Sequence, residues 1–182
     1  MNQPGWRGVR ILKYPSDLVL YSQVIFQNKP DFIIETGTKF GGSSLFFADM
    51  FALFHPEGKV ITIDVTHDQI KNKDPRIEYI LGSSSDRNIV EQVRQKVGGK
   101  RVMVVLDSNH AAYHVKRELR LWSPLVTSGQ YLVIEDCYAG ARPYYPLTAR
   151  DWYLARTNIF KLEQLENQFF FAVTQGGWLK KL

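Results

Sequence analysis

Short apolar runs rich in β-branched residues recur along the chain, and each run ends at polar residues. Such runs are typical of strands buried on both faces of a parallel sheet. They predict strands at residues 32–34, 59–65, 76–81, 101–106 and 130–134. Between them, apolar residues at helical spacing predict helices over 15–27, 43–54, 86–97 and 110–123. Strands that alternate with helices predict a three-layer α/β fold around a mostly parallel sheet.

The C-terminal part of the chain follows a different pattern. A Tyr- and Pro-rich loop at residues 138–146 is long enough to act as a lid, and a helix is expected over 151–165. Residues 169–174 and 178–182 are apolar stretches joined by Gln175-Gly176-Gly177, and glycine pairs suit hairpin turns. We therefore expect an antiparallel hairpin to close the sheet.

Length and composition predict one globular domain over 1–182, with an arm and first helix at 1–30 packed on it. The net charge of +5 is mild and scattered, which argues against nucleic-acid binding. Cys137 is the single cysteine, so a reducing cytoplasm is expected. We see no leader and no apolar run long enough to cross a bilayer, so no membrane partner is expected.

The segment Asp31–Ser44 joins a strand, a glycine loop and a helix, and glycine allows a backbone to approach a ligand closely. Its spacing is E-x-G-x-x-x-G-x-S, not the G-x-G-x-x-G of dinucleotide folds. A carboxylate in the turn repels a pyrophosphate but suits S-adenosylmethionine, which carries a sulfonium, an ammonium and a ribose. The alternative is a tight turn without a ligand. The candidate cofactor residues are Glu35, Gly37, Thr38, Gly41 and Ser43.

Polar residues also follow the later strands, where ligands bind in open parallel sheets. Asp64 ends the second strand and can bind both ribose hydroxyls, or it is a helix cap or solvated acid. Ser83 and Ser84 can line an adenine, or cap the next helix.

Asp107, Glu135 and Asp136 follow two strands that we expect to be neighbours. Carboxylates that close resist being ionised together, and a hard divalent cation such as Mg²⁺ resolves the conflict. The alternative is that one acid pairs with a lysine or arginine and another caps a helix. His110 is a candidate general base. With His114 it forms H-x-x-x-H, but no third zinc ligand is evident.

Several motifs together resemble the cephalosporin hydroxylase / rhamnosyl O-methyltransferase family. They are W-R-G-V-R-I-L-K-Y-P-S-D-L, I-I-E-T-G-T-K-F-G-G-S-S, V-V-L-D-S-N-H, Y-L-V-I-E-D and F-F-A-V-T-Q-G-G-W-L-K-K-L. The resemblance covers nearly the whole chain and implies a Rossmann-like class I methyltransferase fold that binds S-adenosylmethionine and Mg²⁺.

The resemblance also implies roles by position. Glu35, Gly37 and Gly41 match the methionine-side loop, Asp64 the ribose acid, and Ser84 or its neighbours the adenine contact. Asp107, also a cofactor contact, matches a magnesium ligand together with Glu135 and Asp136. His110 stands where the similar catechol O-methyltransferase has a basic lysine.

The predicted function is Mg²⁺-dependent methylation of a hydroxyl on a small molecule, such as a sugar, an antibiotic or another polyhydroxylated acceptor. His110 and Asp107 are the predicted catalytic residues. A silent cofactor-binding scaffold and an NAD-dependent oxidoreductase are alternatives. A hydroxylase would need an iron site drawn from Asp107, His110 and His114. Self-association is plausible from the resemblance and the aromatic-rich ends.

Overall fold

The computed structural model describes residues 4–71, 73–137, 145–169 and 176–182. Within these residues the main sheet has seven strands in the order β5-β4-β3-β6-β7-β9-β8. The five predicted parallel strands are confirmed as β3 (Phe32–Thr36), β4 (Lys59–Asp64), β5 (Ile77–Leu81), β6 (Val102–Leu106) and β7 (Tyr131–Ile134). The antiparallel strands β8 (Phe160–Glu163) and β9 (Trp178–Lys181) complete one edge.

Four predicted helices are present with ends shifted by one or two residues. They are α1 (Pro15–Asn28), α2 (Gly42–Phe54), α3 (Arg87–Val97) and α4 (Ala112–Trp122). Asp86 caps α3, because its side chain accepts a hydrogen bond from the Asn88 N–H. The start of α4 was predicted at His110, and the structure corrects this: His110 lies in the loop before the helix. None of the helices among the described residues combines the length and apolar character that crossing a bilayer requires.

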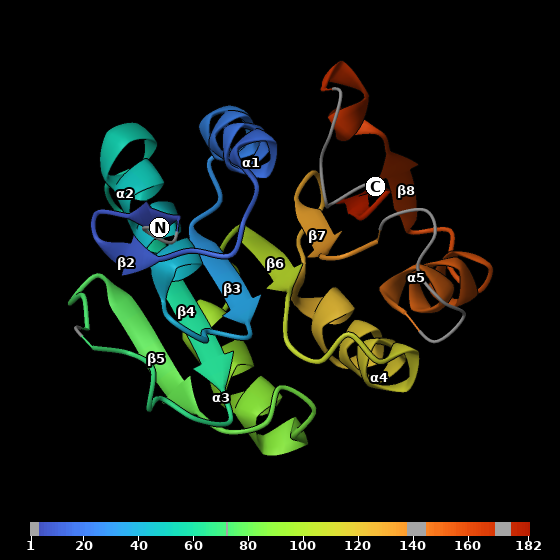
Figure 1. The fold of residues 1–182 in the computed structure, drawn as a ribbon. Coiled ribbons are helices and arrows are strands. Elements are labelled where there is room, and N and C mark those ends of the chain that lie inside the picture. The colour runs from blue at the N-terminus through green and yellow to red at the C-terminus, as the bar shows by residue number, and fades with distance from the viewer. Residues whose placement is uncertain (1–3, 72, 138–144, 170–175) are drawn as a thin grey trace.

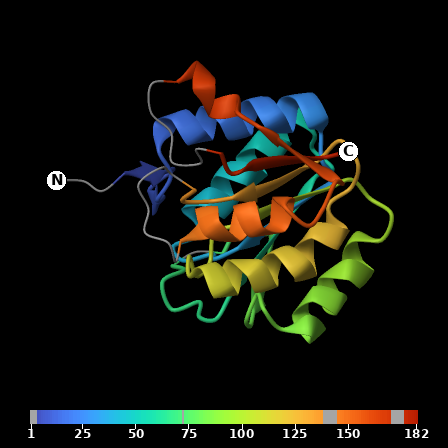
Figure 2. The ribbon, with the colours of Figure 1, turned by 90° about the vertical axis from the view of Figure 1, so that its right-hand side faces the viewer.

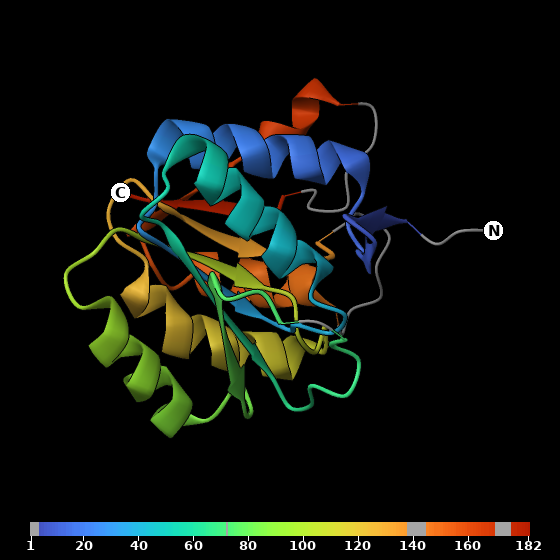
Figure 3. The same ribbon diagram turned by 90° about the vertical axis from the view of Figure 1, so that its left-hand side faces the viewer.

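The sheet lies between two helical layers. Figure 3 shows α1 and α2 on one face, and α3 and α4 on the other. Neighbouring side chains of each central strand enter different cores: Ile33 and Val105 pack with α1 and α2, whereas Ile34 and Val104 pack with α3 and α4. This explains why these strands are apolar throughout and do not alternate with polar residues.

The strand order reverses between β3 and β6, because β4 lies on one side of β3 and β6 on the other. The arrowheads of β3, β4 and β6 point the same way in Figure 1, so their carboxyl ends share one edge of the sheet. In open parallel sheets ligands bind beside this reversal. β6 and β7 are neighbours, as the predicted carboxylate cluster requires.

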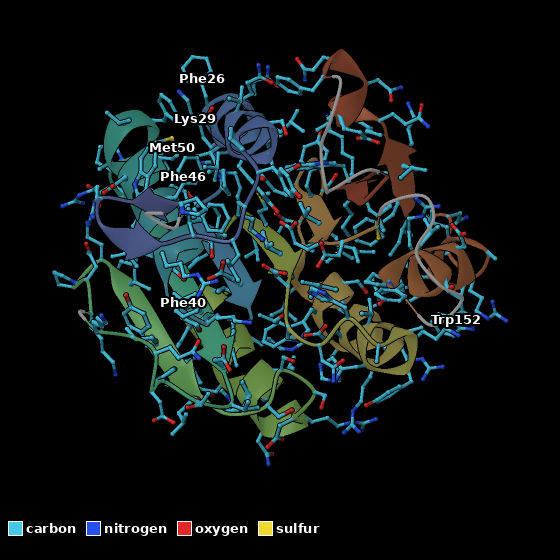
Figure 4. The ribbon with its side chains drawn as sticks, in the orientation of Figure 1. Phe26, Lys29, Phe40, Phe46, Met50 and Trp152 are labelled. Atoms are coloured by element: carbon cyan, nitrogen blue, oxygen red, sulfur yellow. The ribbon has the colours of Figure 1, made fainter. Side chains whose placement is uncertain are left out.

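The predicted helix over 151–165 is wrong in its bounds, since only residues 151–154 are α-helical. Helix α5 (Pro146–Leu154) begins earlier and packs beside α4 (Figure 2), and β8 takes residues 160–163. Phe160 and Leu162 alternate with polar neighbours and pack on the core, so pairing with β9 determines the conformation. In Figure 4 the α5 residue Trp152 lies toward α4, where the Arg120 guanidinium carbon is 4.7 Å from its ring centroid.

The closing antiparallel pair is present, but with a different partner from the one predicted. β9 pairs with β7 and β8. Phe169 lies outside any strand, and the rest of the predicted strand 169–174 falls outside the described residues. The same holds for residues 138–144 of the predicted lid.

The N-terminal arm is not simply extended, because β1 (Gly5–Trp6) and β2 (Val9–Arg10) form a small hairpin. The arm packs on α2: the Trp6 and Phe46 rings meet edge to face at 5.0 Å, and Figure 4 shows Phe46 between α2 and the hairpin. The Trp6 indole N–H also donates to Asp49. These contacts place the residues that follow the hairpin over the glycine loop.

Candidate functional site

The loop after β3 depends on glycine at Gly37. This residue has φ +92°, and a Cβ there would lie 2.0 Å from the Asp107 carbonyl oxygen. Only a residue without a side chain allows the β3 and β6 ends to approach this closely. Gly41, with φ +82°, precedes α2. The loop therefore combines close backbone approach with a helix N-terminus, as predicted for a cofactor loop.

Glu35 supports this loop from below. Its carboxylate is fully buried and accepts hydrogen bonds from the Ser44 hydroxyl and, at 2.8 Å, from the Thr62 hydroxyl. Thr62 also bonds to Thr38, with 2.8 Å between the hydroxyl oxygens. Burial raises the pKa of Glu35. Among the described residues Glu35 lines neither groove of the site, so its position suits holding the loop more than contacting a ligand.

Two grooves meet at the carboxyl edge of the sheet, and they share Gly37, Lys39, Asp107 and Ser108. The acid-side groove is also lined by Arg10, Lys13, Thr38, Phe40, Ser43, His110 and Asp136. The serine-side groove is also lined by Asp64, Val65, Ser83, Ser84, Asn109 and His114. The two grooves form one crevice over the glycine loop, and its two ends are lined by different residues.

Asp64 lies at the end of β4 in the serine-side groove. Its carboxylate accepts hydrogen bonds from the N–H groups of Lys39, at 2.8 Å, and Thr66, at 3.3 Å. Lys39 itself has φ +47°, an uncommon conformation for a residue with a side chain. Asp64 therefore both shapes the glycine loop and lines the groove where a ribose acid is expected.

A polar network lies at the far end of the serine-side groove. The His114 imidazole Nε2 is 3.2 Å from the Ser84 hydroxyl and 3.1 Å from the Ser108 hydroxyl. Ser108 donates to the buried Glu118 carboxylate at 2.7 Å. The His114 imidazole therefore bonds to Ser84 and Ser108 and does not join the cluster of Asp107 and His110, which argues against the two-histidine iron site of a hydroxylase.

Asp107, His110 and Asp136 form a compact cluster in the acid-side groove. His110 Nε2 is 3.2 Å from an Asp107 oxygen, and His110 Nδ1 is 2.7 Å from an Asp136 oxygen. One ligand atom from each residue lies within 4.8 Å of the others. Oxygen and imidazole ligands at this spacing suit a divalent cation.

Protonation in this cluster follows from burial and neighbouring charge. Burial lowers the pKa of His110, but Asp107 and Asp136 outweigh it and raise that pKa to about 10. Burial raises the pKa of Asp107, but the Lys13 ammonium and His110 outweigh it and hold it below its usual value. His110 therefore carries a proton at neutral pH while both carboxylates face it.

Glu135 points to a different neighbour. Its carboxylate lies 2.7 Å from the Lys13 ammonium and accepts a hydrogen bond from the Tyr21 hydroxyl. Lys13 also contacts Asp107 at 2.5 Å. Burial, with the Asp107 charge, raises the pKa of Glu135 to about 7. Asp107 thus contacts both Lys13 and His110, and Glu135 is linked to Asp107 through the Lys13 ammonium.

Sequence reasoning missed Lys13, Lys39, Ser108 and the groove-lining role of His114. Lys13 belongs to the N-terminal motif that carried the family resemblance, but its partner Asp107 lies 94 residues away. Nothing in periodicity or spacing relates these two positions, because their contact is made only when the arm folds over the glycine loop.

The fold is that of class I methyltransferases, with a crevice at the carboxyl edge of its sheet. A solved structure of CmcI with magnesium and S-adenosylmethionine has a TM-score of 0.78 and 22% sequence identity, over 98% of this chain and 76% of that chain. The chain belongs to the Rhamnosyl O-methyltransferase/CmcI family, whose family model matches residues 1–182. The family resemblance predicted from the motifs is therefore confirmed.

Two sequence relatives of the chain have names that specify a reaction. The Rhamnosyl O-methyltransferase of Mycobacterium leprae is 35% identical over 150 residues, which are 80% of this chain and 65% of that protein. The 8-demethyl-8-(2-methoxy-alpha-L-rhamnosyl)-tetracenomycin-C 3'-O-methyltransferase of Streptomyces olivaceus is 30% identical over 125 residues, 69% of this chain and 31% of that protein. The chain spans less than two thirds of the length of both relatives.

Proposed function

We propose that this chain transfers a methyl group from S-adenosylmethionine to a sugar hydroxyl with the help of Mg²⁺. The observation that carries the proposal is the junction at Asp107. This residue lines both the serine-side groove and the acid-side groove, and it contacts His110. A cofactor crevice and a set of cation ligands that share one residue suit methyl transfer to an activated oxygen.

In this proposal the crevice binds the cofactor along its length. The Gly37 turn admits the methionine part, Asp64 binds the ribose hydroxyls, and Ser83 and Ser84 lie where the base would sit. Thr38 and Ser43 complete the acid-side wall, and Gly41 precedes α2 in the same loop. Glu35 acts through Ser44 and Thr62, whose hydrogen bonds to its buried carboxylate fix the loop.

Asp107 and Asp136, which are half-buried and line the acid-side groove, supply carboxylate oxygens for Mg²⁺, and Glu135 adds a third carboxylate at the same edge. The chemistry of this donor set fits a hard cation. When bound, Mg²⁺ supplies a Lewis acid that lowers the pKa of an acceptor hydroxyl. Asp107 and Asp136, which hold the proton on His110, would also hold the cation, and His110 beside them would be the residue that accepts the hydroxyl proton.

The proposed acceptor is a rhamnosyl or similar sugar hydroxyl, because the names of both relatives specify a rhamnosyl substrate or product. The acid-side groove has a mixed polar and apolar lining that includes the half-buried Phe40, and the Arg10 guanidinium carbon stacks 4.4 Å above the Phe40 ring. A flat, partly apolar surface beside hydrogen-bond donors suits the face of a sugar ring.

Calorimetry with S-adenosylhomocysteine and Mg²⁺, followed by mass spectrometry of methyl rhamnoside incubated with S-adenosylmethionine, tests the proposal. We expect cofactor binding, Mg²⁺ binding and a methylated sugar. Binding of the cofactor without Mg²⁺ binding or methyl transfer would instead support the scaffold role.

A further inference from the structure

Lys13 places a positive charge between two acids of the site. Its ammonium is 2.5 Å from an Asp107 oxygen and 2.7 Å from a Glu135 oxygen, and its side chain is only 3% exposed. Lysine is almost never buried to this extent unless it is paired. The ion pairs of Lys13 with Asp107 and Glu135 are therefore part of the interior of the site and are not surface ion pairs.

The contacts around Lys13 form an alternating chain of charges. The Tyr21 hydroxyl donates to Glu135, Lys13 bridges Glu135 and Asp107, and His110 bridges Asp107 and Asp136. Without the bridge, Asp107 and Glu135 would be like charges facing each other in a buried place. A cation shared by two carboxylates is the arrangement that a divalent metal ion also makes.

The fold holds Lys13 at this position through its backbone. A Cβ on Gly42 would lie 2.2 Å from the Arg10 carbonyl oxygen, so the arm rests directly on the first turn of α2. Ile11 is buried in the core with α1 and α2 and fixes the neighbouring chain. Lys13 also lines the acid-side groove, so its flexible side chain has open space beside its present position.

We propose that Lys13 is a positioning residue whose ammonium occupies the place between Asp107 and Glu135 and yields it to a divalent cation. The cation takes over the two carboxylates, and the Lys13 ammonium turns into the acid-side groove beside the acceptor. This inference rests on the proposed Mg²⁺-dependent function. It explains why Glu135 faces Lys13 while Asp136 faces His110.

The test compares Mg²⁺ binding by the wild-type chain, Lys13→Met and Lys100→Met. Methionine keeps most of the length of the side chain and removes its charge. Lys100 is an exposed lysine in the turn before β6, at the opposite end of the sheet, so Lys100→Met controls for net charge. Calorimetry should give a Mg²⁺ dissociation constant for Lys13→Met roughly tenfold or more below that of wild type, because a competing charge next to the ligands is gone. The Lys100→Met value should equal that of wild type.

An unchanged or weaker Mg²⁺ affinity in folded Lys13→Met overturns the inference while leaving the proposed function intact. Absence of Mg²⁺ binding in the wild-type chain overturns both.

A second measurement uses the wild-type chain in case Lys13→Met does not fold. Acetylation by a water-soluble ester, followed by peptide mass spectrometry, reports access to each lysine. Lys13 should be protected without metal and modified several times faster with saturating Mg²⁺, whereas Lys100 should react equally in both. Equal or slower modification of Lys13 with Mg²⁺ contradicts the exchange.

Discussion

Asp107 lines both grooves of the site, so a change there can affect cofactor binding and chemistry, and the two effects are measured separately. One oxygen faces Lys13 and the other faces His110. Asp107→Asn keeps the shape of the side chain and removes the charge that a cation needs. We expect methyl transfer to fall by about a hundredfold or more, whereas S-adenosylhomocysteine affinity should change much less.

Radiolabel transfer to methyl rhamnoside and calorimetry measure these two quantities. Asp68→Asn, an exposed acid after β4, is the matched control and should retain wild-type rates. Wild-type transfer by Asp107→Asn would remove Asp107 from the mechanism.

His110 gives the metal-free protein a characteristic pH dependence. Its pKa is raised to about 10 in the folded chain, so the folded state binds the proton more tightly than the unfolded state. The resulting stability is complete below about pH 6.5, the ordinary histidine value, and is lost as pH rises toward that raised pKa.

The difference in melting temperature between wild type and His110→Gln should therefore shrink from pH 6.5 to 10 in the absence of divalent cations. A constant difference for His110→Gln would mean that the imidazole is not held charged by Asp107 and Asp136.

At the scale of elements, the conformation of the loop between β3 and α2 depends on a single glycine, Gly37. Gly37→Ala adds a Cβ in a left-handed conformation and against the Asp107 carbonyl. We expect it to destabilise the fold by about 3 kcal/mol or more and to abolish cofactor binding.

Gly99→Ala is the control for Gly37→Ala, because Gly99 also has positive φ but no atom within 4 Å of the added Cβ. That change should cost about 1–2 kcal/mol and leave cofactor binding intact. Urea unfolding and calorimetry give both values. Similar costs for the two variants would show that close approach to β6 is unimportant.

The elements that the sequence could predict are those determined by their own residues. The β-branched runs of β3, β4 and β6 and the helical spacing of apolar residues between them are local signals, and they predicted the parallel sheet and four helices. The segment 151–165 carries no comparable signal. There Phe160 and Leu162 become a strand because β9 offers a free edge, which is a contact made only in the folded chain.

The residues of the site also divide into those that the sequence could predict and those that depend on contacts made only in the folded chain. Asp64, Asp107 and Asp136 follow strands and could be placed at one edge from topology alone. The role of Lys13 could not, because the arm reaches Asp107 across most of the chain. The alternative that one of the acids pairs with a lysine or arginine was open, but the sequence could not tell that the acid is Glu135 or that its partner is Lys13.

For the whole molecule, the proposed ligands should stabilise the fold together. A ligand that binds only the folded state adds about 2.7 kcal/mol at a concentration of 100 times its dissociation constant. S-adenosylhomocysteine and Mg²⁺ should each raise the melting temperature. NADH should leave it unchanged, because the loop lacks the dinucleotide spacing. Stabilisation by NADH and not by S-adenosylhomocysteine would favour the oxidoreductase alternative.

The most direct test of the site is the position of a cation in a crystal of the wild-type chain grown with S-adenosylhomocysteine and Mn²⁺. Anomalous scattering locates Mn²⁺ without reference to any prior assignment. The account predicts one strong peak in contact with the Asp107, Glu135 and Asp136 carboxylates, beside the cofactor sulfur and with the Lys13 ammonium displaced. A peak away from Asp107, or a bound cofactor with no peak at this edge of the sheet, would contradict it.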